Sequence, residues 1–74
     1  MTNKASALVV DARGMRCPWP ALRLARAMRD ATEVLLIADD PQAGREVAAL
    51  ADEHDWSVET DAATADEGRW LVRR

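Results

Sequence analysis

The sequence of 74 residues has little cysteine and histidine, with one of each, Cys17 and His54. A single cysteine excludes a disulfide within the chain and a dithiol oxidoreductase, which needs a second, resolving cysteine. One cysteine and one histidine do not supply the roughly four ligands of a structural zinc site. We therefore expect no metal and no cofactor, and a lone thiol favours the reducing cytoplasm.

Long apolar runs are also missing from the sequence. No stretch approaches the roughly 20 apolar residues of a membrane span, so we expect no insertion into a membrane. Residues 1–6 are mostly polar or small, and no apolar region of a signal peptide follows them. No repeat or low-complexity segment divides the chain. We expect a single domain over residues 1–74, with residues 1–6 as a flexible N-terminal tail.

The net charge of −3 is unevenly distributed. Residues 1–30 carry six basic and two acidic side chains, a net +4, whereas residues 31–74 carry four basic and eleven acidic ones, a net −7. The basic half could meet an anionic ligand or an acidic partner, and a pair of solvated helix faces explains the pattern equally well. Arg23, Arg26 and Arg29 could contact nucleic acid. The negative net charge and the absence of interleaved aromatics argue against direct binding, and we expect protein docking instead.

The order of hydrophobic patterns predicts βαβαββ. Strands are expected at residues 7–10, 34–38, 56–60 and 69–73, a helix at 20–30, a turn at 11–14 and a polar turn at 61–68. A second helix is expected to start at Pro41, with Asp40 as its N-cap.

Right-handed crossovers then place both helices on one face of a four-stranded sheet, and the last strand returns antiparallel beside the second. The predicted fold class is α+β: a two-layer βαβαββ sandwich with a mixed sheet. Apolar residues point to both faces of the first two strands. This makes a partner or a second copy on the open face plausible.

Residues 11–20 carry the candidate chemistry. Cys17 directly precedes the first helix, where free backbone N–H groups and the positive end of the dipole favour a thiolate. Arg13 and Arg16 lie close in sequence and could add to this effect, while Gly14 is free to take a positive φ in the turn. The sequence therefore predicts a lowered pKa for Cys17.

Two prolines flank the start of the helix. Proline suits the first helical turn, and it pushes the residue before it toward extended geometry. We therefore expect Cys17 and Trp19 to be non-helical and the regular helix to begin near Pro20. Trp19 either covers the edge of the core or serves as a docking anchor.

One activated cysteine is sufficient for sulfur relay. A cysteine hydrolase needs a base, and nothing in the sequence brings His54 to Cys17. In a relay, the Cys17 thiolate attacks the outer sulfur of a donor persulfide. An acceptor later attacks that sulfur, and Cys17 leaves as a thiolate.

Arg-Gly-Met-Arg-Cys-Pro-Trp-Pro at residues 13–20, followed by an amphipathic helix, resembles the Cys-Pro-x-Pro signature of the TusA/SirA-like sulfur carriers. Residues 35–41 and 70–74 resemble that family's second strand with its helix start and its basic last strand, so the resemblance covers nearly the whole chain. It implies a βαβαββ fold similar to the C-terminal domain of a translation initiation factor. It also implies that Cys17 carries a persulfide within a motif formed by Arg13, Gly14, Arg16, Pro18, Trp19 and Pro20.

The resemblance implies two protein partners: a sulfur donor of the cysteine desulfurase or rhodanese type, and a sulfur acceptor. The sulfur would serve tRNA thiolation, molybdenum-cofactor supply or sulfur oxidation. An acidic residue between the prolines is familiar in the tRNA-thiolation type, and Trp19 departs from it, which suggests a different docking partner. Two alternatives stay open: a non-catalytic protein- or RNA-binding module, and a sulfur-accepting partner of a thiosulfate transporter.

Overall fold

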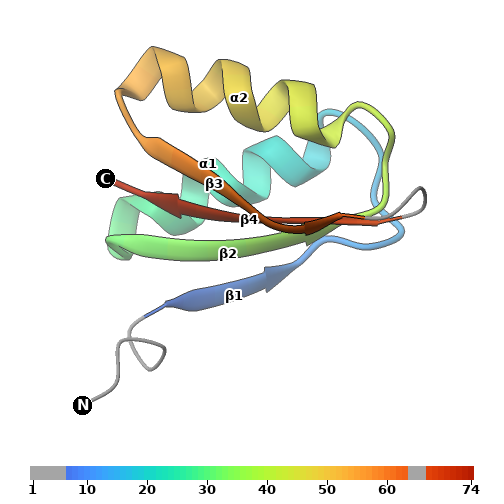
Figure 1. Ribbon diagram of the computed structural model, residues 1–74, viewed down its shortest axis with the longest axis horizontal. Coiled ribbons are helices and arrows are strands. Elements are labelled where there is room, and N and C mark those ends of the chain that lie inside the picture. The colour runs from blue at the N-terminus through green and yellow to red at the C-terminus, as the bar shows by residue number, and fades with distance from the viewer. Residues whose placement is uncertain (1–6, 64–66) are drawn as a thin grey trace.

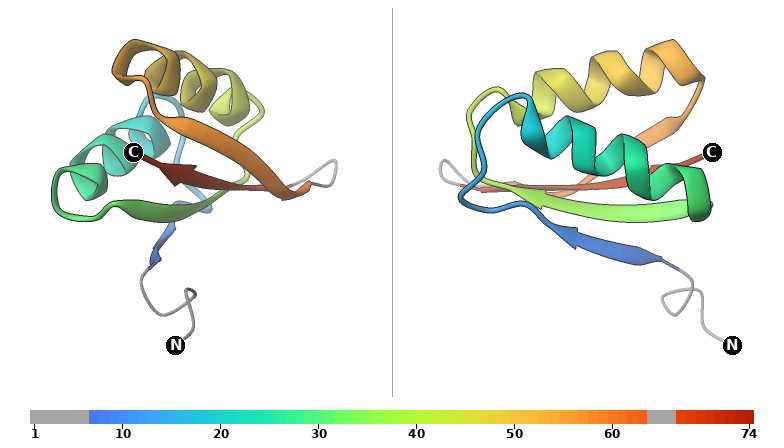
Figure 2. Two further views of the ribbon diagram at one scale, coloured as in Figure 1. Left: turned by 60° about the vertical axis from the view of Figure 1, so that its left-hand side comes forward. Right: turned by 180° about the vertical axis from the view of Figure 1, so that it is seen from behind.

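The computed structural model describes residues 7–63 and 67–74 and shows six elements in two layers (Figure 1). They are β1 (Leu8–Asp11), α1 (Trp19–Asp30), β2 (Glu33–Ala38), α2 (Ala43–His54), β3 (Ser57–Ala63) and β4 (Gly68–Arg73). Both helices cover the same face of the sheet (Figure 2). The predicted two-layer βαβαββ sandwich is confirmed. The N-terminal tail predicted at residues 1–6 lies outside the described residues.

The four strands form one mixed sheet in the order β1-β2-β4-β3. β1 runs parallel to β2, with Leu8 opposite Val34. β4 is antiparallel to both of its neighbours, so that Val72 lies opposite Val34 on one side and Val58 on the other. The last strand therefore returns beside the second, as the sequence predicts.

The core lies between the helices and one face of the sheet. It takes alternate residues from the strands and every third or fourth residue from the helices, because these spacings share a face. Its largest fully buried side chains are Pro20, Leu24, Met28, Val34, Leu36, Val47 and Val72.

Trp70 packs at the edge of this core, where α2 begins. A Cβ added at Gly44 would lie 3.3 Å from Cζ2 of the indole. Glycine therefore lets the first turn of α2 approach the ring closely.

Two predictions at the helix starts are wrong. The first helix begins near Pro20, as expected, but Trp19 is its first residue and is therefore helical, because the Leu22 N–H donates to the Pro18 carbonyl (3.1 Å). The second begins at Ala43 with Gln42 as its N-cap, and Asp40 is not the cap. Asp40 instead closes a separate turn before the helix, where its carbonyl accepts the Ala43 N–H at 3.0 Å.

The predicted polar turn at residues 61–68 is also partly wrong. β3 continues to Ala63 because it pairs with β4 as far as Ala63 opposite Gly68, past an irregularity between Thr60 and Ala62. Residues 64–66 of that turn lie outside the described residues.

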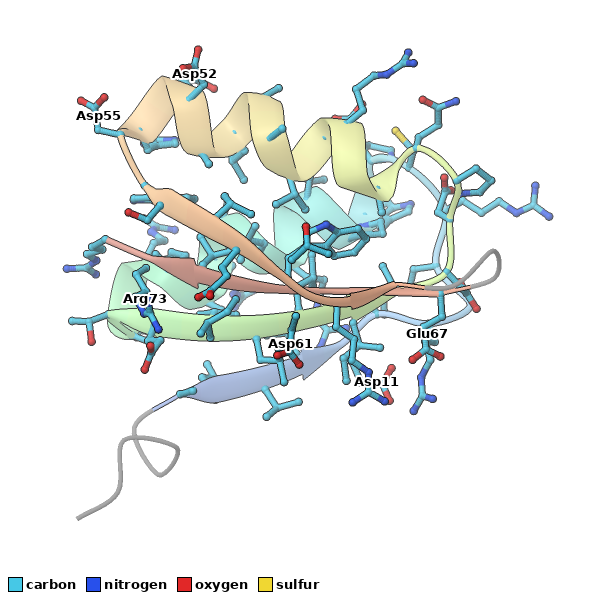
Figure 3. The ribbon with its side chains drawn as sticks, in the orientation of Figure 1. Asp11, Asp52, Asp55, Asp61, Glu67 and Arg73 are labelled. Carbon is cyan, nitrogen blue, oxygen red and sulfur yellow. The ribbon has the colours of Figure 1, made fainter. Side chains whose placement is uncertain are left out.

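Among residues 7–63 and 67–74, no helix or strand covers the sheet face opposite the helices, and this face carries both apolar and charged side chains. Val9 is 56% exposed. Asp11, Asp61, Glu67 and Arg73 lie on this side in Figure 3. The expected partner or second copy on this face stays a prediction. Within the described part of the chain, no helix has the length and apolar character needed to cross a membrane.

Candidate functional site

The candidate site lies where β1 and β2 end. Because these strands are parallel neighbours, the chain leaves both at the same end of the sheet (Figure 2). We call residues 12–18, between β1 and α1, the thiol loop, and residues 39–42, between β2 and α2, the acidic loop. The topology therefore brings the two loops together.

The thiol loop begins with the tight turn that the sequence predicts. Gly14 has a φ of +86°, and the Met15 N–H donates to the Ala12 carbonyl at 3.1 Å. Farther along, the Trp19 N–H donates to the Arg16 carbonyl at 2.8 Å. Cys17 lies in this second turn and is non-helical, as expected, and its peptide bond with Pro18 is cis.

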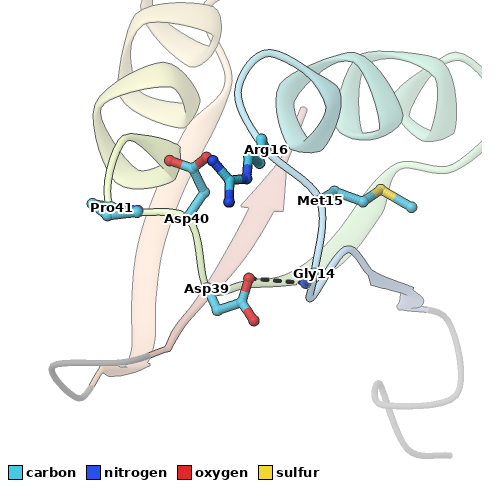
Figure 4. A pocket seen from close by; sticks show the side chains of 6 residues that line it. All are labelled: Gly14, Met15, Arg16, Asp39, Asp40 and Pro41. Atoms are coloured by element: carbon cyan, nitrogen blue, oxygen red, sulfur yellow. Dashed lines mark hydrogen bonds between the residues drawn. The ribbon is translucent and has the colours of Figure 1, made fainter.

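Two carboxylates of the acidic loop hold the backbone of the thiol loop. Oδ1 of Asp39 accepts the Gly14 N–H at 2.9 Å (Figure 4). Asp40 accepts the Cys17 N–H through Oδ2 and the Gln42 N–H through Oδ1, both at 2.7 Å. The N–H groups of Gln42 and Cys17, with the positive charge of Arg16, hold the pKa of Asp40 below its ordinary value. Both carboxylates thus link the two loops, and Asp40 does so at the backbone of Cys17 itself.

The Cys17 side chain is exposed and faces a third carboxylate. Its Sγ lies 3.4 Å from Oε2 of Glu46, in the first turn of α2, and the thiol donates to that oxygen. Partial desolvation, then this hydrogen bond and the negative charges of Glu46 and Asp40, raise the pKa of Cys17 above its ordinary value. The predicted lowering of the Cys17 pKa is therefore wrong.

Of the groups that the prediction relied on, Arg13 and the N–H groups of Cys17 and Trp19 are engaged elsewhere. Arg13 forms a bidentate ion pair with Asp11 (Nε–Oδ1 2.9 Å, Nη2–Oδ2 2.7 Å), and its Nη1 lies 3.6 Å from Oε1 of Glu67. The Cys17 N–H donates to Asp40 and the Trp19 N–H to the Arg16 carbonyl, so neither is available to a thiolate.

The other motif residues differ in their exposure and surroundings. Arg16 and Asp40 line a hollow of about 370 Å³ beside the thiol loop (Figure 4). Trp19 is 59% exposed and Leu22 51%, so the indole does not cover the core. Pro18 is exposed, whereas Pro20 is fully buried and anchors the start of α1.

Glu46 is the site residue that sequence reasoning missed. Its signal was available, since parallel neighbouring strands bring the starts of both helices together and Glu46 lies one turn into the second. His54 lies near the other end of α2, roughly 12 Å from Glu46 along the helix axis. Its ring stacks on that of Trp56, with centroids 4.6 Å apart. In residues 7–63 and 67–74, no three Cys, His, Asp or Glu side chains are grouped so as to hold a metal ion.

The fold and the site define a class of small βαβαββ domains that present one exposed cysteine before the first helix. Residues 8–74 match the family described as Sulfurtransferase TusA. The chain belongs to this TusA family, as the resemblance of its Cys-Pro-Trp-Pro segment indicated. Among solved structures it is similar to the SirA-like protein of Desulfitobacterium hafniense, with a TM-score of 0.77 and 17% sequence identity over 89% of this chain and 95% of that one. That likeness supports the fold.

Proposed function

We propose that this protein is a sulfur carrier that receives sulfane sulfur on Cys17 as a persulfide and passes it to an acceptor. The observation that carries the proposal is the exposed thiol of the chain's one cysteine, in the Cys-Pro-Trp-Pro segment of a TusA-family domain. A single thiol is sufficient for this reaction because the same sulfur acts first as nucleophile and then as leaving group.

Loading is a sulfur exchange without net oxidation. The Cys17 thiol loses its proton to solvent, and the thiolate attacks the outer sulfur of the donor persulfide R–S–S⁻. The bond between that outer sulfur and the donor's cysteine sulfur breaks, its electron pair stays on the donor as R–S⁻, and Cys17–S–S⁻ forms. Unloading repeats these steps with the acceptor thiolate as nucleophile and Cys17 as leaving group.

The raised pKa of Cys17 changes the expected rates without preventing the exchange. A smaller fraction of the free protein is thiolate at neutral pH, but each thiolate is a stronger nucleophile because intrinsic nucleophilicity rises with thiol pKa. In the unloading step Cys17 leaves more slowly, because a thiolate of higher pKa is a poorer leaving group. We therefore expect the free carrier to react slowly, and the rate of sulfur transfer to depend on the partner protein.

The proposed donor is a cysteine desulfurase or rhodanese-type protein, and the proposed acceptor is a further protein thiol. The exposed side chains of Trp19 and Leu22, one helical turn apart beside the thiol loop, support docking of such proteins over α1. The chemistry needs a reduced thiol, so we propose the cytoplasm as its compartment.

The test is incubation with a cysteine desulfurase and cysteine, followed by intact-protein mass spectrometry. We expect a gain of about 32 Da per sulfur atom that a thiol reductant removes, as persulfidation is reversible. Cys17→Ser should show no gain. Transfer of this added sulfur to a downstream thiol protein, measured by the same mass gain on that protein, completes the test.

Absence of any adduct with desulfurase and rhodanese donors would refute the carrier. RNA binding by an adduct-free protein would then support a non-catalytic module. Adduct formation with a thiosulfate transporter, and with neither soluble donor, would support the role of a transporter partner.

A further inference from the structure

We propose that Glu46 determines the specificity of the sulfur site by favouring reaction partners that carry a cationic group beside their reactive sulfur. This deepens the proposed function and rests on it, since the partner is the sulfur donor or the acceptor. The chemical class is a persulfide or disulfide flanked by an ammonium or guanidinium group.

The first support is the position of Glu46 relative to the reacting atom. Its Oε2 is 3.4 Å from Sγ of Cys17, and the sulfur is exposed. A sulfur that approaches Cys17 along a line of attack must therefore come within a few ångströms of this carboxylate. The backbone of Glu46 is held in the first turn of α2, where its N–H donates to the Gln42 carbonyl at 3.0 Å.

The second support is the balance of charge around the sulfur. Asp40 accepts the Cys17 N–H at 2.7 Å, so a second carboxylate lies at the backbone of Cys17. Of the two motif arginines, Arg13 is bound to Asp11 and Glu67, and Arg16 acts on Asp40. The side of the sulfur that faces Glu46 therefore keeps a negative charge.

This negative charge discriminates between partners. An anionic persulfide is repelled, and Glu46 accepts the thiol hydrogen that must leave before attack. A partner cation removes both obstacles, because it pairs with Glu46 and offsets the partner's own negative sulfur. The thiol proton then passes to solvent, the new S–S bond forms at Sγ, and the donor's S–S bond breaks with its electron pair on the donor sulfur. The site is exposed, so we expect about fivefold discrimination per unit charge, from the Coulomb energy of two charges 4 Å apart in water.

The test uses disulfides of different charge and needs no sulfur-carrier activity. The Cys17 thiolate attacks R–S–S–R to give Cys17–S–S–R and R–S⁻. We compare the rates for cystamine, which is cationic, for bis(2-hydroxyethyl) disulfide, which is neutral, and for oxidised glutathione, which is anionic. Each rate is divided by that of N-acetylcysteinamide with the same disulfide, which removes differences in leaving group.

In the native protein the corrected rate for cystamine should exceed that for the neutral disulfide about fivefold, counting the one ammonium group that flanks the attacked sulfur, and oxidised glutathione should be slowest. Glu46→Gln should abolish this order, and Glu46→Asp should keep much of it. Glu53→Gln is the matched control, because it removes the same charge from α2 two turns farther from the thiol, and it should keep the native order. High salt should weaken the preference of the native protein, since the charges are exposed.

The proposal is overturned if Glu46→Gln keeps the native order, or if Glu53→Gln abolishes it equally. Salt-insensitive rates in the native protein would overturn it too, without any variant that might fold poorly. Charge preference without sulfur uptake from protein donors would refute the carrier function alone, and uptake without charge preference would refute the role of Glu46 alone.

Discussion

The thiol loop and the acidic loop lie side by side, and they differ in what they bring to the site. The thiol loop carries the sulfur and two arginines within a recognisable motif. The acidic loop and the first turn of α2 carry no reactive group, but their three carboxylates hold the thiol loop's backbone and the thiol hydrogen. The reactive atom and the groups that set its pKa therefore come from different segments.

A motif near a cysteine therefore does not by itself determine the protonation state of its sulfur. Arg13 is nearer to Cys17 in sequence than Glu46, yet it is bound to Asp11 and has no hydrogen bond with the thiol. The pKa of the thiol follows the residues that the fold brings next to it. Four predictions test this division of roles between the two loops.

The largest effect is expected where α2, and with it Glu46, rests on Trp70. In Gly68→Ala the new Cβ would lie 2.5 Å from Cη2 of the indole, so the ring must move. Overpacking of this kind costs about 1–3 kcal/mol. Urea unfolding should show this loss, and a displaced α2 should speed alkylation of Cys17 by iodoacetamide. Gly44→Ala is the control, since its Cβ would lie at 3.3 Å and alanine is favourable in a helix, so its loss should be smaller.

Gly14→Ala tests the thiol loop by urea unfolding as well, but here the expected cause of destabilisation is backbone strain and not a steric contact. No atom lies within 4 Å of a Cβ at this position, yet the φ of +86° is unfavourable for alanine. The expected loss of unfolding free energy is about 1–2 kcal/mol. Gly14→Asn should lose less, because asparagine tolerates positive φ. Equal losses for both variants in urea unfolding would show that backbone strain is not the cause.

The acidic loop can be dissected one carboxylate at a time through amide hydrogen exchange. Asp40→Ala removes the acceptor of the Cys17 N–H and should speed exchange of that amide, whereas Asp39→Ala should speed exchange of Gly14 alone. Asp40→Asn keeps one oxygen acceptor and should be intermediate at Cys17. Two-dimensional NMR gives each amide separately. Unchanged exchange at Cys17 in Asp40→Ala would show that the carboxylate does not hold this loop.

The fold was predictable because its signals are local and repetitive. Period-two and period-3.6 patterns mark the strands and helices, and the handedness of crossovers orders them. The errors fall at the ends of helices and of one strand. At the helix starts, a single hydrogen bond determines which residue is the first in the helix. The Leu22–Pro18 bond overrides the usual effect of Pro20 on Trp19, and the Asp40 turn delays α2 to Ala43.

The site was predictable in its nucleophile and not in its electrostatics. Cys17 and the positive φ of Gly14 follow from the sequence of the thiol loop itself. The hydrogen bond to Glu46 joins residues 29 positions apart, so it depends on how two helix starts meet. No local pattern encodes that distance, although the parallel order of β1 and β2 brings the two segments to the same end of the sheet.

The smallest effect is expected at the ion pair of the thiol loop. Hydrogen bonds from Arg13 lower the pKa of Asp11 to about 2. The unfolded value is about 3.9, so the pair's contribution to stability is complete above that pH and is lost as the pH falls toward 2. NMR titration of the Asp11 carboxyl should give the lowered value, and Arg13→Gln should return it toward the ordinary one. The same variant should leave Cys17 alkylation within about twofold of native at each pH, since screening weakens an exposed charge not in contact with the thiol. A markedly slower Cys17 in Arg13→Gln would mean that the thiol loop does supply its own cation, and the contrast between the loops would fail.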